Sequence, residues 1–187
     1  MSIRLGWIEK AAMLIPGYRG YKKRENLRED DRLVRKYVAD ILRQAAANLQ
    51  EALREMSNRL GSQLMVITQY PGNPLQLLDD AARRILAEAN QVEHAEMGYS
   101  PSFSRLKVKE EELRRLLEID NAMIGYANVI LEVSKQILQS ARSTGWFDTR
   151  LLTTLLDSIN EIGKIMAERR RFLHGGEAVR SGEIGKT

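Results

Sequence analysis

The chain has 187 residues, of which 43% are hydrophobic, carries a formal net charge of +4 and contains no cysteine. This length and apolar content suit one domain with a sizeable core. The lack of cysteine excludes disulfides, thiolate nucleophiles and cysteine-held zinc or iron–sulfur centres. No run approaches the roughly 18 to 20 apolar residues of a spanning helix, and the N-terminus does not read as a secretion signal. We therefore expect a cytoplasmic protein, or one peripheral at a membrane.

Residues 1–15 form a short amphipathic pattern. On a helical wheel the apolar side chains Ile3, Trp7, Ile8 and Leu14 share one face. Such a face can dock on a protein complex, lie in a membrane interface, or pack on the protein's own bundle. We expect these four residues to carry partner or membrane docking.

Residues 16–24 follow as a turn rich in aromatic and basic side chains. Pro16-Gly17 is typical of a type II turn, and Tyr18 and Tyr21 come directly after it. The tyrosines could close the end of a bundle or stack on unpaired bases. The cations of this turn predict contact with an anionic surface such as phospholipid or nucleic acid; they are Arg19, Lys22, Lys23 and Arg24.

Four long helices are expected after the turn, over about 22–69, 75–97, 104–143 and 148–173. Proline and glycine clusters separate the first three, and Gly61 marks a weak point inside the first. Gly145 is expected to end the third helix, and Asp148 to cap the fourth. A polar tail over 174–187 is expected to be disordered.

The apolar residues recur every seven positions, as in the columns Leu42, Leu49 and Met56 or Met123, Ile130 and Ile137. The sequence therefore predicts an all-α fold, an elongated antiparallel four-helix bundle with coiled-coil-like packing. A continuous first helix would be roughly 70 Å long and would overhang the second. Its early apolar column needs a cover, either the N-terminal segment or a second copy, and we expect a homo-oligomer; that column is Leu27, Val34, Val38 and Ile41.

Charge is unevenly distributed along the chain. Residues 17–43 hold nine Lys or Arg against five Asp or Glu, residues 164–187 hold six against three, and the body between them is acidic. Pairs such as Asp31 with Arg35 are spaced to neutralise one another on a helix. The basic ends still point to an anionic partner, and a second basic contact is expected at Arg169, Arg170 and Arg171.

Catalytic chemistry is hard to find. The two histidines, His94 and His174, do not form the paired motifs of a di-iron bundle. His94 is best interpreted as a solvated helix end, and no glycine loop of the phosphate-binding type is present. We expect no catalytic residue, cofactor, metal ligand or small-molecule substrate.

The sequence thus predicts a non-enzymatic helical scaffold or adaptor that self-associates and docks through its N-terminal segment onto a protein complex or an anionic membrane surface. An accessory nucleic-acid-binding protein with basic ends is the main alternative. A metal- or cofactor-binding bundle enzyme is the remaining one.

Overall fold

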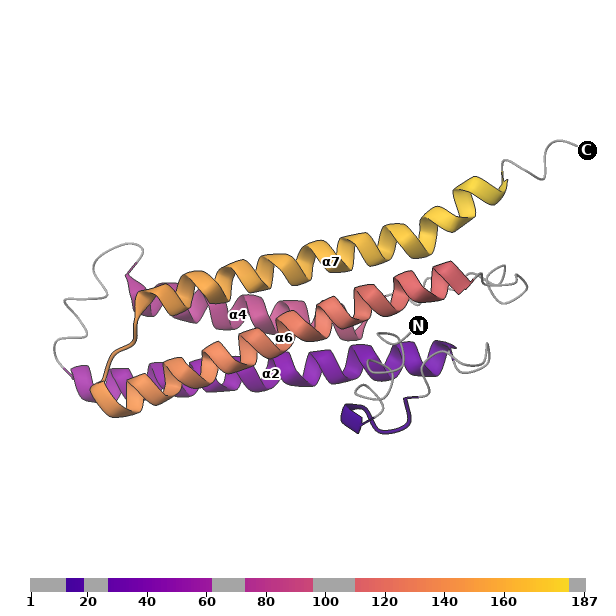
Figure 1. Cartoon of the computed structure of the whole chain (residues 1–187). Helices are drawn as coiled ribbons and strands as arrows, with labels where there is room; N and C mark the ends of the chain where they lie inside the picture. Colours follow the sequence, from indigo (N-terminus) through magenta and orange to yellow (C-terminus); the bar gives the residue numbers. More distant parts are fainter. Residues whose placement is uncertain (1–12, 19–26, 62–72, 96–109, 182–187) are drawn as a thin grey trace, which may run out of the picture.

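A computed structural model describes residues 13–18, 27–61, 73–95 and 110–181. These ranges contain four long helices, α2 (Leu27–Leu60), α4 (Pro74–Glu93), α6 (Glu110–Thr144) and α7 (Thr149–Ser181), and no strand (Figure 1). The predicted all-α bundle is confirmed. None of these helices is long and apolar enough to cross a membrane.

Gly61 ends α2, well before the predicted end at residue 69. Its φ of +48° lies in the left-handed region that favours glycine, and its amide donates to the Ser57 carbonyl at 3.3 Å. Residues 22–26 and 62–69 of the predicted helix lie outside the described residues. With 34 residues, α2 is about 51 Å long, so the expected 70 Å helix is not formed.

Local capping sets the ends of the next helices. Asn73 caps α4, since its side-chain oxygen accepts from the Gln76 amide at 2.9 Å. Gly145 ends α6 with a φ of +79°, and Asp148 accepts the Arg150 amide at 2.9 Å at the start of α7. The roles predicted for Gly145 and Asp148 are confirmed. Residues 104–109 lie outside the described residues, and α4 ends at Glu93, four residues before its predicted end.

α7 continues to Ser181, past its predicted end at residue 173. Residues 174–181, for which we expected disorder, thus belong to a helix in this structure. Gly175 and Gly176 each cost a helix about 1 kcal/mol, but they are followed by good helix formers in Glu177 and Ala178. Figure 1 shows this last part of α7 projecting past the other helices. Residues 182–187 lie outside the described part of the chain.

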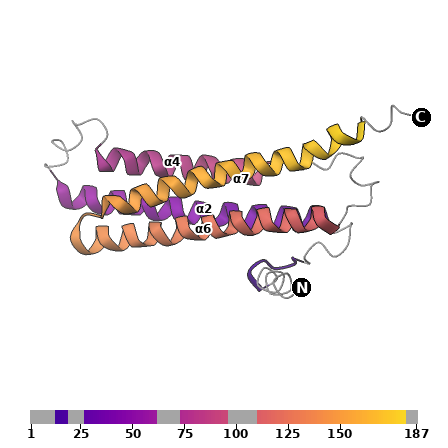
Figure 2. The same cartoon turned by 45° about the horizontal axis from the view of Figure 1, so that its top comes forward.

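The four helices form two hairpins that pack side by side. α2 contacts α4 and α6, and α7 contacts α6 and α4. Successive helices run in opposite directions, whereas the neighbours α2 and α6 run in the same direction, as do α4 and α7 (Figures 1 and 2). The expected antiparallel arrangement therefore holds for successive helices but not for the neighbouring pairs α2–α6 and α4–α7.

The core follows the predicted apolar columns along the bundle. Leu42, Leu49, Met56, Met123, Ile130 and Ile137 are all buried. Val34, Val38 and Ile41 of the expected overhang are buried too, at 1%, 0% and 7% exposure, within a single chain. The bare column on which we based self-association is therefore not found in the described part of α2. Coiled-coil-like packing and a homo-oligomer stay predictions.

Candidate functional site

Residues 13–18 lie against the bundle, and we call them the N-terminal strap. Ile15 and Tyr18 are buried, at 2% and 5% exposure, while Met13 and Leu14 are 86% and 48% exposed. The Tyr18 amide donates to the Ile15 carbonyl at 3.1 Å, and Gly17 has a φ of +87°, so Pro16-Gly17 forms the expected turn. The strap therefore has an inner, anchored side and an outer, apolar side.

The strap lies beside α2 and near the first half of α6 (Figures 1 and 2). A Cβ on Gly17 would stand 3.5 Å from the Leu33 Cδ1 atom of α2. Burial, and then the negative charges of Asp120 on α6 and Asp30 on α2, raise the pKa of the Tyr18 phenol well above its usual range. Tyr18 thus lies near two helices that are far apart in the sequence.

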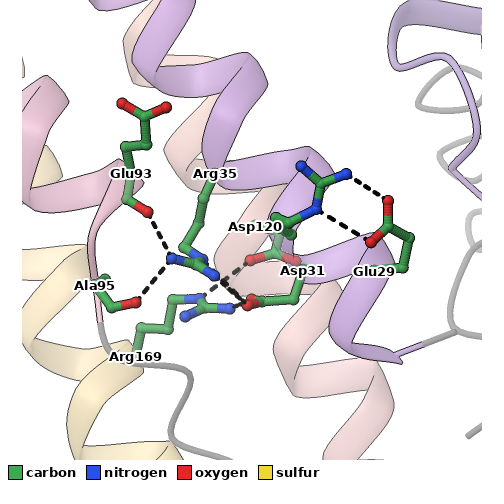
Figure 3. A network of polar contacts seen from close by, with 8 residues as sticks. Glu29, Asp31, Arg35, Glu93, Ala95, Asp120 and Arg169 are labelled. Carbon is green, nitrogen blue, oxygen red and sulfur yellow. Dashed lines mark hydrogen bonds and ion pairs between the residues drawn. The ribbon is translucent and has the colours of Figure 1, made fainter. Parts of the chain in front are cut away.

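A network of charged side chains lies buried at the same end of the bundle. Arg169 of α7 is 2% exposed and forms ion pairs with Asp31 of α2 and Asp120 of α6, whose side chains are 1% and 0% exposed (Figure 3). Its Nε atom lies 3.5 Å from the Asp120 Oδ1 atom. One guanidinium thereby joins three helices.

Arg35 connects this network to α4. Its Nε and Nη2 atoms both lie 3.1 Å from the Asp31 Oδ2 atom. Its Nη1 atom donates to the carbonyls of Glu93 and Ala95 at 2.8 and 2.7 Å (Figure 3). These carbonyls belong to the end of α4, where helical partners are missing, so Arg35 acts as a side-chain cap.

We call this set, Asp30, Asp31, Arg35, Asp120 and Arg169, the buried ionic network. They are the charged residues that are buried in the described part of the chain. Burying charges costs several kcal/mol per ion unless they are paired and hydrogen-bonded. The network therefore stabilises one arrangement of the helices only while its members stay together.

Exposed ion pairs flank the network. Arg43 of α2 pairs with Glu93 of α4, and Arg115 of α6 pairs with Glu168 of α7. The hydrogen bond from Arg43 lowers the pKa of Glu93. Such solvent-exposed pairs contribute little to stability, because water and salt screen them, so they position helix surfaces more than they hold them together.

The predicted site residues have different outcomes. Leu14 is half-exposed on the strap, as docking requires, whereas Ile3, Trp7 and Ile8 lie outside the described residues. Arg170 and Arg171 are exposed on α7, but Arg169 is buried in the network. Arg169 is thus not available for the anion contact we expected, because its helix phase turns it toward Asp31 and Asp120. The cations of the turn lie outside the described residues as well; these are Arg19, Lys22, Lys23 and Arg24.

We did not predict the buried ionic network from the sequence, although the sequence contains two signs of it. The predicted pairing of Asp31 with Arg35 is confirmed, but we expected it on a solvated helix surface. Asp120 interrupts the wide apolar arc of α6 between Ile119 and Met123. A carboxylate inside such an arc is a sign of a buried partner.

The described residues provide no group of three metal-ligating side chains placed to hold an ion. The carboxylates of Asp31 and Asp120 are already paired with arginine. His94 is exposed at the end of α4, where its amide donates to the Asn90 carbonyl at 3.0 Å.

Comparison of the chain with protein-family models gives no match. Neither curated proteins nor solved structures yield a significant similarity.

Proposed function

We propose that this protein is a non-enzymatic helical scaffold or adaptor that docks through residues 1–24 onto a protein complex or a membrane surface. The observation that supports this proposal is that the strap has one side buried against the bundle and one apolar side exposed. Ile15 and Tyr18 fix it to the bundle, while Met13 and Leu14 face solvent beside the amphipathic residues 1–12.

The bundle would act as a rigid base for this docking segment. The strap is fixed beside α2 and near α6, and it would anchor the docking segment that precedes it in the sequence. An anchored start lowers the entropy that a docking segment loses when it binds. The outer apolar side chains of the strap then extend the docking face of residues 1–12.

The partner surface should be apolar with an anionic border. Trp7 and Leu14 would enter an apolar groove or the acyl boundary of a bilayer, while the cations of residues 19–24 lie near phosphate or carboxylate groups. A tryptophan side chain suits both surfaces, because it has a large apolar body and a polar N–H.

Self-association belongs to the same proposal. The large apolar side chains exposed on the described helices are Leu77 of α4 and Val129 of α6, and single exposed apolar residues are ordinary on a protein surface. If copies associate, the N-terminal segment is the better candidate for the contact. Light scattering of the full chain and of a version lacking residues 1–15 would test this: a dimer that persists without residues 1–15 would contradict it.

Vesicle flotation and pull-down from a cell extract test the docking itself. The variants Trp7→Glu and Leu14→Glu place a charge on the docking face and should abolish binding to anionic vesicles or to a protein partner. Val129→Glu is the matched control, since it charges an exposed apolar residue elsewhere on the bundle and should bind like the unmodified chain.

Salt dependence distinguishes apolar docking from the nucleic-acid alternative. The exposed side chains of Arg170 and Arg171 favour that alternative. Apolar docking should survive high salt, whereas phosphate binding weakens steeply with salt. Binding that is unaffected by Trp7→Glu and lost on neutralising Arg19, Lys22, Lys23 and Arg24 would replace the docking proposal with the nucleic-acid one.

A further inference from the structure

The buried ionic network forms a continuous series of contacts across the bundle. Arg169 is shared between Asp120 and Asp31, and Asp31 is shared between Arg169 and Arg35. Arg35 in turn holds the carbonyls of Glu93 and Ala95 (Figure 3). A change at Asp120 can therefore reach the end of α4 through three side chains, those of Arg169, Asp31 and Arg35.

Tyr18 of the strap lies at the other end of this series. Tyr18 is 5% exposed, and its strap lies beside α2, which carries Asp30, and near the first half of α6, which carries Asp120 (Figures 1 and 2). Ile15, three residues before Tyr18, is buried as well. The negative charges of both carboxylates help to raise the pKa of the Tyr18 phenol. The seated strap thus covers the bundle beside the helices that carry Asp30 and Asp120.

We propose that the seating of the strap is coupled through the buried ionic network to the hold of Arg35 on the end of α4. A partner that lifts Tyr18 from the bundle then also loosens Glu93–Ala95. The strap is in this sense a conformational switch, with a seated and a lifted state.

The physical reason is the change in dielectric around Asp30 and Asp120. In a dry interior, an ion pair is several times stronger than in water. Lifting Tyr18 admits water to these carboxylates and weakens the attraction between Asp120 and Arg169. The weaker attraction to Asp120 lets the Arg169 guanidinium move relative to Asp31. Asp31 then no longer fixes the Arg35 guanidinium in the orientation that reaches the carbonyls of Glu93 and Ala95. By linkage, loosening the α4 end must weaken strap seating by the same factor.

This inference goes beyond the proposed function, because it concerns the free protein and needs no partner. Through this coupling, docking at the N-terminal segment would loosen Glu93–Ala95 at the end of α4. A failure of docking to vesicles or proteins would leave the coupling standing, and the reverse also holds.

Amide hydrogen exchange of the full chain tests the coupling. The reporter is the His94 amide, which makes the last hydrogen bond of α4, to Asn90. The internal control is the Gly145 amide, bonded to Ala141 at 3.0 Å at the opposite end of the bundle. Tyr18→Ala should speed exchange at His94 at least about fivefold, the lower range of allosteric coupling, and leave Gly145 unchanged. Ile15→Ala unseats the strap independently and should act in the same direction.

The background variant Arg35→Lys shows whether the effect passes through Arg35. A lysine keeps the charge, but its ammonium group cannot serve Asp31 and two carbonyls in the geometry of a guanidinium. In this background, Tyr18→Ala should change exchange at His94 by less than about twofold. Unchanged exchange at His94, equal acceleration at His94 and Gly145, or a full effect of Tyr18→Ala in the Arg35→Lys background would each overturn the proposal.

Discussion

The two ends of the bundle are stabilised in different ways. At the end where α6 meets α7, apolar side chains such as Met56, Ile137 and Phe147 are buried, and among the residues described there no charged side chain is buried with them. At the other end, the buried ionic network fills the same kind of position between helices. Apolar packing tolerates small shifts because dispersion contacts are many and individually weak, whereas a buried ion loses most of its compensation when one partner moves. The charged end is therefore the one suited to respond to a docking event.

The largest expected effect is the loss of stability that follows when the buried ionic network at the charged end is disrupted. Arg169→Met leaves Asp31 and Asp120 without the shared guanidinium, and should lower the free energy of unfolding by about 3 to 5 kcal/mol. Urea denaturation measures it. Arg170→Met removes an exposed arginine one position away and should change stability by no more than about 0.5 kcal/mol. Similar denaturation midpoints for the two variants would mean that the network is not a determinant of the fold.

A second variant breaks the apolar end. Ile137→Ala leaves a cavity in the fully buried core and should cost about 2 to 5 kcal/mol, whereas Ile137→Val should cost about 0.5 to 1.5 kcal/mol. The same urea titration compares them. Because no buried charged residue is found at this end in the described part of the chain, Ile137→Val should leave exchange at the His94 amide unchanged. Faster exchange there would show that the two ends are not independent.

The charged end should also differ from the apolar end at high pH, because the strap buries Tyr18 there. Burial and the two carboxylates raise the pKa of Tyr18, so the folded state holds this phenolic proton more tightly than the unfolded state does. Stability should then fall as the pH rises above about 10, the usual tyrosine value, because the unfolded chain ionises first. The near-ultraviolet phenolate absorbance should show a late phase from Tyr18. Tyr18→Phe should remove that late phase, and an unchanged titration curve in this variant would contradict the burial of Tyr18.

The smallest effect concerns a half-buried carboxylate outside the network. Glu88 of α4 lies opposite Gly163 of α7, where an added Cβ would stand 3.7 Å from its Oε1 atom. Burial raises the pKa of Glu88, and nearby Arg84 partly offsets this. A raised carboxyl pKa destabilises the fold above that pKa, and the penalty disappears as the pH falls below about 4.3, the unfolded value.

Glu88→Gln should therefore stabilise the protein by about 0.5 kcal/mol at neutral pH and by nothing at pH 3 to 4. Thermal unfolding at the two pH values measures the difference. Asp80→Asn, which neutralises an exposed carboxylate on the same helix, is the control and should not stabilise the protein at either pH. A loss of stability in Glu88→Gln at neutral pH would show that Arg84 compensates Glu88 fully.

Much of the fold could be predicted from the sequence because its causes are local or periodic. The seven-residue columns identify the buried faces, and each helix end rests on a nearby residue, such as Asn73 or Gly145. The extension of α7 past residue 173 was not predicted, because Gly175 and Gly176 disfavour a helix and the tail is polar. Of the docking site, the residues that could be placed were Leu14 and the turn at Pro16-Gly17, both matters of local pattern.

Tertiary structure alone decided which charges are inside. Asp31, Asp120 and Arg169 come from three helices, and nothing in their local sequence states that a partner lies 49 or 138 residues away. Whether a charge is solvated or buried depends on helix phase and on which helices become neighbours, and α2 lies beside α6 instead of diagonally opposite to it. The amino-acid sequence by itself determined the helices and their apolar faces, since these follow from side-chain spacing. The network and the seat of Tyr18 exist only once those faces have met, because an ion pair needs both partners in place.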